Sequence, residues 1–288
     1  MYDPNISKLM AQFSELTYTQ YKNGTPPGND GKVTMPAGFT QIASFTAPEI
    51  DLNSNLKTYE SLDWSSIADS KSLKSLAIGI QDVYFGFAAT SANYNVIAIR
   101  GTQSNFEWLM DATIPQVPVP LVWYNHGKFK LAKVHLGFLI FFGLLADQIM
   151  NAAKQFDNSL PCYVCGHSLG AALATLVAPA VSIGTLNPNV KMYNYASPRV
   201  GDPNFASAYS AIISESYRVV NLADLVPMIP PSQIAGWTYQ HVTEEWSFLN
   251  QSGNVGGNHA LIGPNNYTDA VNNTIPTNAA RHYPVTGL

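Results

Sequence analysis

The feature that most constrains the fold of this 288-residue chain is the segment CYVCGHSLGAALA at residues 162–174. Its first part is a short apolar run that predicts a buried strand, and its last part is a run of small residues that predicts a helix. The turn between them is Gly-His-Ser-Leu-Gly. Glycines let such a turn close and let the helix approach the sheet, so that a serine hydroxyl is lifted above the sheet edge. The segment predicts an α/β fold with Ser168 as a nucleophile, and the alternative is an ordinary strand-to-helix turn.

The rest of the chain alternates between strand and helix patterns. Strands are predicted at 78–90, 95–101, 190–197 and 216–222, and helices at 5–21, 137–156, 169–182 and 203–213. The strand runs are short and almost continuously apolar, which is typical of a mostly parallel central sheet flanked by helices. No linker interrupts the pattern, so we expect residues 1–288 to form one domain. Residues 24–75 mix polar and turn residues and predict no clear element.

Composition excludes several other classes of protein. Hydrophobic residues make up 46% of the chain and charged residues 12%, which argues against disorder. The net charge is −4, so no basic field would hold a nucleic acid. No H-E-x-x-H motif or carboxylate cluster occurs, and neither a metal nor a cofactor is expected. Cys162 and Cys165 would lie about 10 Å apart on opposite faces of a strand, too far for a disulfide.

A serine nucleophile requires a histidine base and a carboxylate that orients the histidine. In proteins with this turn, the acid and then the base follow the serine along the chain. Asp224 fits the acid because it follows the strand predicted at 216–222, and functional groups gather at strand ends in parallel sheets. Among the other carboxylates, Asp202 suits a helix N-cap, and Glu244 and Glu245 suit solvated or locally paired positions. Asp269 lies in a terminal helical segment.

His259 is the predicted base because it follows the glycine-rich loop SGNVGGN, which can lie at the same sheet edge as Asp224. We expect His241 to be structural and His282 to lie at the surface. His126 and His135 are excluded as the base because they precede the serine. His167 is expected to pack or hydrogen-bond beside Ser168. Acyl transfer also requires donors for an oxyanion, and the N–H of Leu169 with the N–H and hydroxyl of Thr102 fit that role.

Eight pieces of the chain between about residues 80 and 265 carry a resemblance to a known family. They are YFGFAA, VIAIRGTQSNFEWLMDA, VHLGF, CGHSLGAALA, YASPRVGDPNF, RVVNLADLVPMIPP, YQHVTEEW and NHALIG. In this order they resemble the class 3, fungal-type triacylglycerol lipase family of the α/β-hydrolase superfamily. The resemblance implies an α/β-hydrolase fold with a lid helix, the triad Ser168, Asp224 and His259, and Thr102 as the oxyanion residue.

An apolar stretch follows Thr102 and predicts a lid over about residues 103–125. Its candidate acyl-binding side chains are Phe106, Trp108, Leu109, Met110 and Ile114. Three of them fall on one face of a helix, and a protein in water rarely leaves so much contiguous apolar surface exposed. We expect a cover over Ser168 that opens at an oil surface, and the alternative is a buried core helix.

These observations predict a serine hydrolase of lipid esters that contacts a lipid–water interface. A feruloyl esterase, a phospholipase A1 or a polyester hydrolase would use the same residues, and an acyltransferase or a silent binding protein on this fold are further alternatives. Emulsified lipid is met outside the cell, so we expect an extracellular protein, with a cytoplasmic one as the alternative. The start MYDPNISKLMAQ lacks the pattern of a signal peptide, which would then have been removed.

Overall fold

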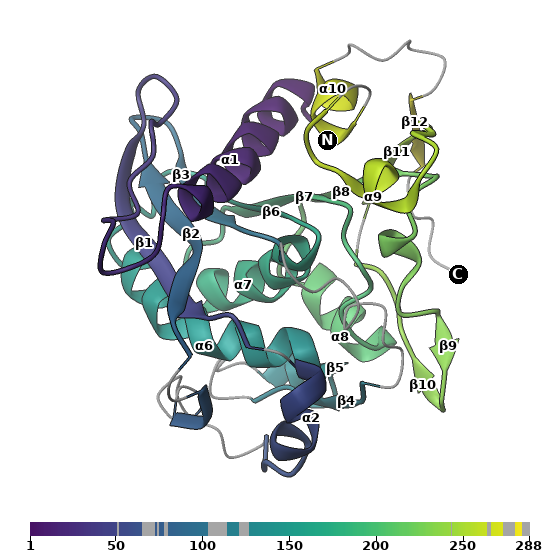
Figure 1. Cartoon of the computed structure of the whole chain (residues 1–288). Coiled ribbons are helices and arrows are strands. Elements are labelled where there is room, and N and C mark those ends of the chain that lie inside the picture. The colour runs from purple at the N-terminus through teal and green to yellow at the C-terminus, as the bar shows by residue number, and fades with distance from the viewer. Residues whose placement is uncertain are drawn as a thin grey trace.

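The computed structural model describes residues 1–50, 52–64, 73, 75–77, 80–102, 114–120, 127–242, 244–263, 266–272 and 280–283. Within these residues the centre is an eight-stranded sheet in the order β1-β2-β3-β6-β7-β8-β11-β12 (Figure 1). Its strands are β1 (Thr40–Pro48), β2 (Asp82–Thr90), β3 (Asn95–Ile99), β6 (Cys162–His167), β7 (Val190–Tyr195), β8 (Ser216–Asn221), β11 (Glu244–Phe248) and β12 (Ala280–Tyr283).

The middle of the sheet is parallel, as the short apolar runs predict. Strands β3, β6, β7, β8 and β11 pair in parallel, whereas β1, β2 and β12 join in antiparallel fashion at the two sides. Strand β6 therefore has parallel neighbours on both sides, and all of its residues are buried. Cys162 and Cys165 lie in this strand as free, buried thiols. The carboxyl ends of the parallel strands meet at one edge, where catalytic side chains of such folds gather.

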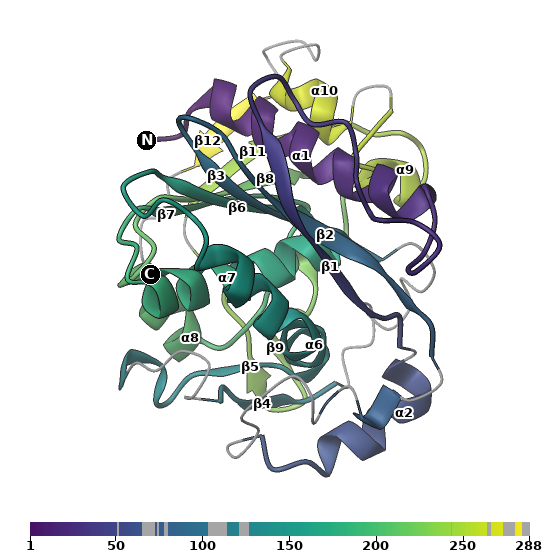
Figure 2. The same cartoon turned by 90° about the vertical axis from the view of Figure 1, so that its left-hand side faces the viewer.

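Helices cover both faces of the sheet (Figure 2). One face carries α6 (Leu136–Ala153), α7 (Leu169–Thr185) and α8 (Pro203–Ser210), and the other carries α1 (Pro4–Lys22) and α10 (Tyr267–Val271). Each face has its own apolar core. Helix α6 has the length and composition of a membrane span, but 78% of it is buried inside the molecule, as in a core helix.

Shorter elements complete the described chain. They are α2 (Leu52–Glu60), η1 (Ser75–Ala77), β4 (Gln116–Pro118), η2 (Gly127–Phe129), β5 (Lys133–His135), η3 (Val226–Met228), β9 (Gln233–Ile234), β10 (Trp237–Thr238) and α9 (Val255–His259). Strand β1 and helix α2 lie in the stretch 24–75, for which the sequence predicts no clear element. Strand β1 is at the side of the sheet and most of its residues are only partly buried, so it lacks a strong apolar pattern.

The expected lid falls largely outside the described residues. Phe106, Trp108, Leu109 and Met110 all lie in the part that is not described. The described part, 114–120, differs from the expectation of a cover: β4 pairs with β5, and Ile114 is 1% exposed within the core that also contains α6. Ile114 thus packs inside the protein, because the strand pairing of β4 holds this segment against the core.

Candidate active site

Ser168 stands at a strained turn between β6 and α7. Its φ of 60° and ψ of −126° lie where residues other than glycine are rarely found, which costs about 1–3 kcal/mol. The turn depends on both glycines of the motif. A Cβ at Gly166 would collide with the carbonyl oxygen of Gly170, and a Cβ at Gly170 would collide with that of Ile99 in β3. Only glycine therefore lets α7 begin this close to the sheet.

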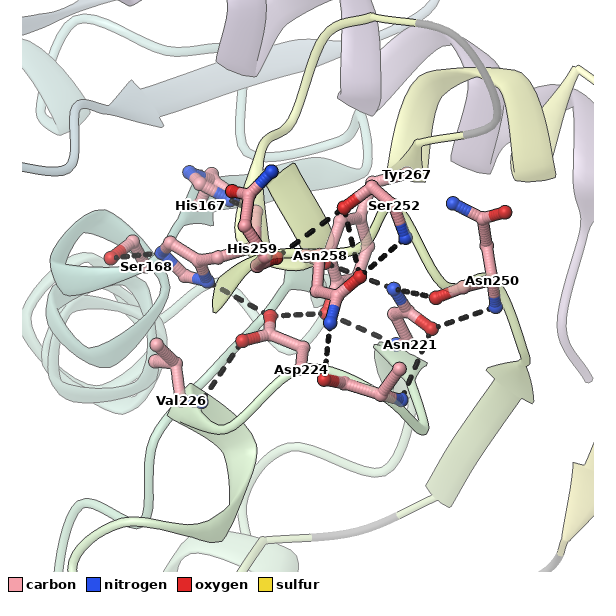
Figure 3. Close-up of polar contacts among 12 residues, drawn as sticks. His167, Ser168, Asn221, Asp224, Val226, Asn250, Ser252, Asn258, His259 and Tyr267 are labelled. Atoms are coloured by element: carbon pink, nitrogen blue, oxygen red, sulfur yellow. Dashed lines mark hydrogen bonds and ion pairs between the residues drawn. The ribbon is translucent and has the colours of Figure 1, made fainter. Parts of the chain in front are cut away.

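Three residues predicted from their chain order meet at this turn (Figure 3). The Oγ atom of Ser168 lies 2.9 Å from Nε2 of His259, and Nδ1 of His259 lies 2.8 Å from Oδ2 of Asp224. Ser168 follows β6, Asp224 follows β8, and His259 ends α9, so three separate loops supply them. The carboxylate holds the proton on Nδ1, which leaves Nε2 free to accept the serine proton. The arrangement can therefore activate a hydroxyl as a nucleophile.

The carboxylate of Asp224 is buried but has three donors. Oδ1 accepts a hydrogen bond from the N–H of Val226 at 2.9 Å, and Oδ2 accepts from the Tyr267 hydroxyl at 2.7 Å as well as from His259. Burial and then the charge of Asp224 raise the pKa of Tyr267 well above its usual value, so its hydroxyl stays a donor. A buried charge requires such partners. Sequence reasoning missed Tyr267, since nothing in its neighbourhood marks it.

An asparagine network joins the acid loop to the base loop (Figure 3). The side-chain amide of Asn221, at the end of β8, donates to the carbonyl oxygens of Asn250 and Asn258 at 3.0 and 2.9 Å. Asn258 in turn donates to the carbonyl of Ala223 at 3.1 Å. Because Ala223 and Asn258 directly precede Asp224 and His259, these bonds hold the acid and the base in register. The sequence offers only scattered asparagines as a sign of this network.

Three of the remaining candidates take structural positions. His241 lies with Nε2 2.7 Å from the carbonyl oxygen of Pro227. A carbonyl oxygen only accepts, so Nε2 is the donor. Asp202 caps α8 as predicted. Glu245 pairs with buried Arg218 at 3.1 Å, a local ion pair of the expected kind. His282 lies in β12, whose side chains are not described, and His126 is outside the described residues.

A cavity of about 280 Å³ opens above the serine. Its lining residues are Tyr18, Lys22, Thr102, His167, Ser168, His259, Ala260, Leu261 and Ile262. Thr102 therefore borders the same space as Ser168, and Leu169 begins α7, where backbone N–H groups have no partner within the helix. Among the described residues no group of three or more His, Cys, Asp or Glu side chains could hold a metal ion. The cavity thus brings the candidate nucleophile Ser168, the candidate base His259 and the candidate donor Thr102 together beside apolar walls.

Comparison with known proteins places this arrangement in a family. Residues 96–234 match the family described as Lipase (class 3), and this range includes both Ser168 and Asp224. Residues 96–234 therefore belong to the class 3 lipase family. The family resemblance of the sequence motifs is thereby confirmed.

Three curated relatives match part of this chain. The secreted mono- and diacylglycerol lipase A of Penicillium cyclopium is 36% identical over 154 residues, which are 52% of this chain and 47% of that protein. A lipase of Rhizomucor miehei is 30% identical over 202 residues, 68% of this chain and 53% of that protein. Phospholipase A1-II 7 of Oryza sativa subsp. indica is 32% identical over 176 residues, which are 51% of this chain and 43% of that protein. The chain spans about half the length of these relatives.

Two solved structures share the fold of this chain. A mutant form of MDLA from Penicillium cyclopium has a TM-score of 0.62 at 23% identity. The match covers 98% of this chain and 86% of the MDLA chain. The mono- and diacylglycerol lipase of Aspergillus oryzae has a TM-score of 0.59 at 23% identity, and the match covers 93% of this chain and 90% of that protein's chain. The predicted α/β-hydrolase fold is therefore confirmed.

Proposed function

We propose that this chain is a serine hydrolase that cleaves the carboxylic esters of acylglycerols. The observation that carries the proposal is the relay from Ser168 through His259 to Asp224, with contacts of 2.9 and 2.8 Å at the floor of a cavity. The names of the fungal relatives, mono- and diacylglycerol lipase among them, support the substrate class. No step in the proposed reaction requires a metal or a cofactor.

The reaction follows from the geometry of these groups. Ser168 Oγ attacks the ester carbonyl while Nε2 of His259 takes its proton, and Asp224 stabilises the imidazolium that forms. The N–H of Leu169 and the donors of Thr102 are the proposed oxyanion hole. The tetrahedral intermediate then expels the alcohol, which takes the proton from His259. Water attacks the acyl-serine by the same route and releases the fatty acid.

The cavity walls suit an acyl chain, and one residue favours a second candidate substrate. Ala260, Leu261 and Ile262 follow the base and line the cavity with apolar groups. Lys22, at the end of α1, lines the same cavity with a cation. A cation there could attract the phosphate of a glycerophospholipid, and the Oryza sativa relative is named a phospholipase A1. Phospholipase A1 activity is therefore the second candidate function.

Three variants and a substrate panel test these proposals. Ser168→Ala should lower kcat by about a millionfold, the loss seen when a serine protease loses its nucleophile. The panel compares diolein, triolein, phosphatidylcholine, phosphatidylglycerol and methyl ferulate with p-nitrophenyl butyrate. Lys22→Gln should lower the phospholipid-to-diolein ratio if the phospholipid is a substrate, and Lys8→Gln, on the same helix outside the cavity, should leave the ratio unchanged. Full activity in Ser168→Ala would overturn the proposed nucleophile.

We also propose that the protein acts outside the cell and contacts a lipid–water interface. The Penicillium cyclopium relative is named as secreted, which supports the location. The assay is the fraction of total esterase activity found in the medium of the producing cells. Sedimentation of the Ser168→Ala protein with a triolein emulsion measures the contact with lipid without hydrolysis. Activity retained wholly within the cells would contradict the proposed location.

A further inference from the structure

Tyr18 contributes to the site from the far end of the chain. It lies in α1, 149 positions before His167, and its buried hydroxyl is 2.8 Å from Nδ1 of His167. Helix α1 crosses the sheet on the face opposite α7, and its last turns reach the edge where Ser168 stands (Figure 2). Burial raises the pKa of Tyr18 above its usual value, so the hydroxyl keeps its proton. The mechanism described above does not use this residue.

The hydrogen bonds of His167 have a single consistent direction. Its Nε2 lies 2.8 Å from the backbone carbonyl oxygen of His259, which can only accept, so Nε2 carries the proton. Burial, and then the neighbouring His259, hold the pKa of His167 well below 6.5, so the ring is neutral and Nδ1 has no proton. Nδ1 therefore accepts a hydrogen bond from the Tyr18 hydroxyl. The imidazole of His167 thus connects Tyr18 to the backbone of the base.

The hydroxyl of Tyr18 also packs against the backbone of Gly101. The fit is tight, because a Cβ at Gly101 would collide with the Tyr18 hydroxyl and would lie 3.1 Å from the Cβ of Ser168. Gly101 directly precedes Thr102, the proposed oxyanion residue. Close packing at Gly101 and two hydrogen bonds therefore connect the oxyanion loop, through Tyr18 and His167, to the carbonyl of His259.

We propose that Tyr18 is a positioning residue that holds the oxyanion loop and the base at a fixed separation through His167. This inference rests on the proposed function. Loss of the hydroxyl would leave Nδ1 of His167 without this partner inside the protein and would leave a gap beside Gly101. The imidazole and the Gly101 backbone would then shift, and the oxyanion donors and the base would lose their common reference.

Tyr18→Phe is the test, because it keeps the ring and removes only the hydroxyl. We expect kcat on p-nitrophenyl butyrate to fall about 10–100-fold with KM within about threefold, since the hydroxyl acts on the transition state and not on substrate binding. Phosphonate labelling of Ser168 should slow by a similar factor. Mass spectrometry gives the labelled fraction of the soluble protein, so the labelling rate does not depend on how much protein is recovered.

Tyr193→Phe is the matched control. Tyr193 is also buried, and its hydroxyl accepts the N–H of Asp3 at 3.1 Å, so it holds the opposite end of α1. If Tyr18 served only to dock the helix, both variants would lose activity alike; we expect Tyr193→Phe to keep the wild-type kcat. The double variant Tyr18→Phe with His167→Gln should be no slower than the slower single variant, because both changes break one chain of bonds.

Three results would overturn the inference: a kcat of Tyr18→Phe within twofold of wild type, equal losses in Tyr193→Phe, or effects of Tyr18→Phe and His167→Gln that multiply. These outcomes differ from a failure of the proposed function. In that case the wild-type protein would hydrolyse no ester in the panel, or Ser168→Ala would remain active. Wild-type esterase activity with an unaffected Tyr18→Phe would reject the role of Tyr18 alone.

Discussion

Tyr267→Phe removes one oxygen atom from the support of Asp224. The Tyr267 hydroxyl is fully buried, donates to Asp224 Oδ2 at 2.7 Å and accepts the N–H of Asn221 at 3.0 Å. A hydrogen bond to a charged group contributes about 1.5–3 kcal/mol to stability, so we expect a loss of about 2–3 kcal/mol. At roughly 2–4 °C per kcal/mol for a chain of this size, Tm should fall by about 4–12 °C.

Loss of the Tyr267 hydroxyl should also slow catalysis. With the donor gone, Asp224 keeps its bonds to Val226 and His259 but can rotate, and each 1.4 kcal/mol lost from the transition state costs about tenfold in rate. We expect kcat/KM on p-nitrophenyl butyrate to fall about 10–100-fold. That is less than the roughly 10⁴-fold seen when a serine protease loses its carboxylate, because the carboxylate is still present.

Tyr209→Phe provides the comparison. Tyr209 is equally buried, but its hydroxyl bonds to the neutral Ser216 at 2.9 Å, and it lies in α8, outside the cavity lining. It should lower Tm while leaving kcat/KM unchanged. Thermal denaturation and initial rates are measured on the same samples of both variants. Wild-type kcat/KM in Tyr267→Phe, or equal loss of activity in Tyr209→Phe, would refute the argument that the hydroxyl orients Asp224.

Three further predictions follow from buried groups. Gly170→Ala places a Cβ against the β3 backbone and should cost more than about 3 kcal/mol or prevent folding, measured by urea denaturation. Cys162 and Cys165 should both titrate as thiols after denaturation without reductant, and finding none would contradict the free thiols. The pKa of His167 lies well below 6.5, so the unfolded chain binds a proton that the folded chain does not. His167 should therefore lower stability by about 1.4 kcal/mol per pH unit below about 6.5, and His167→Gln should remove this part of the slope while the similar contribution of buried His241 remains.

The sequence alone predicted what depends on neighbours in the chain. The turn at Ser168 is a local structure: the strand before it, two glycines and the small residues after it lie within 13 positions, 162–174. Apolar patterns likewise predicted α1, α6 and four of the parallel strands, β3, β6, β7 and β8, because burial imposes its pattern residue by residue. Asp224 and His259 followed from chain order, since successive parallel strands bring their ends to one edge.

The polar groups that support those residues depend on how the whole chain packs. Tyr18 and Tyr267 look like other aromatic residues of amphipathic helices, and their partners His167 and Asp224 lie 149 and 43 positions away. Which hydroxyl reaches which ring depends on the face of the sheet that each helix covers and on how far along the strands it lies. Side-chain periodicity carries no information about that placement, because many placements bury the same apolar face equally well, and only packing of the whole chain selects one.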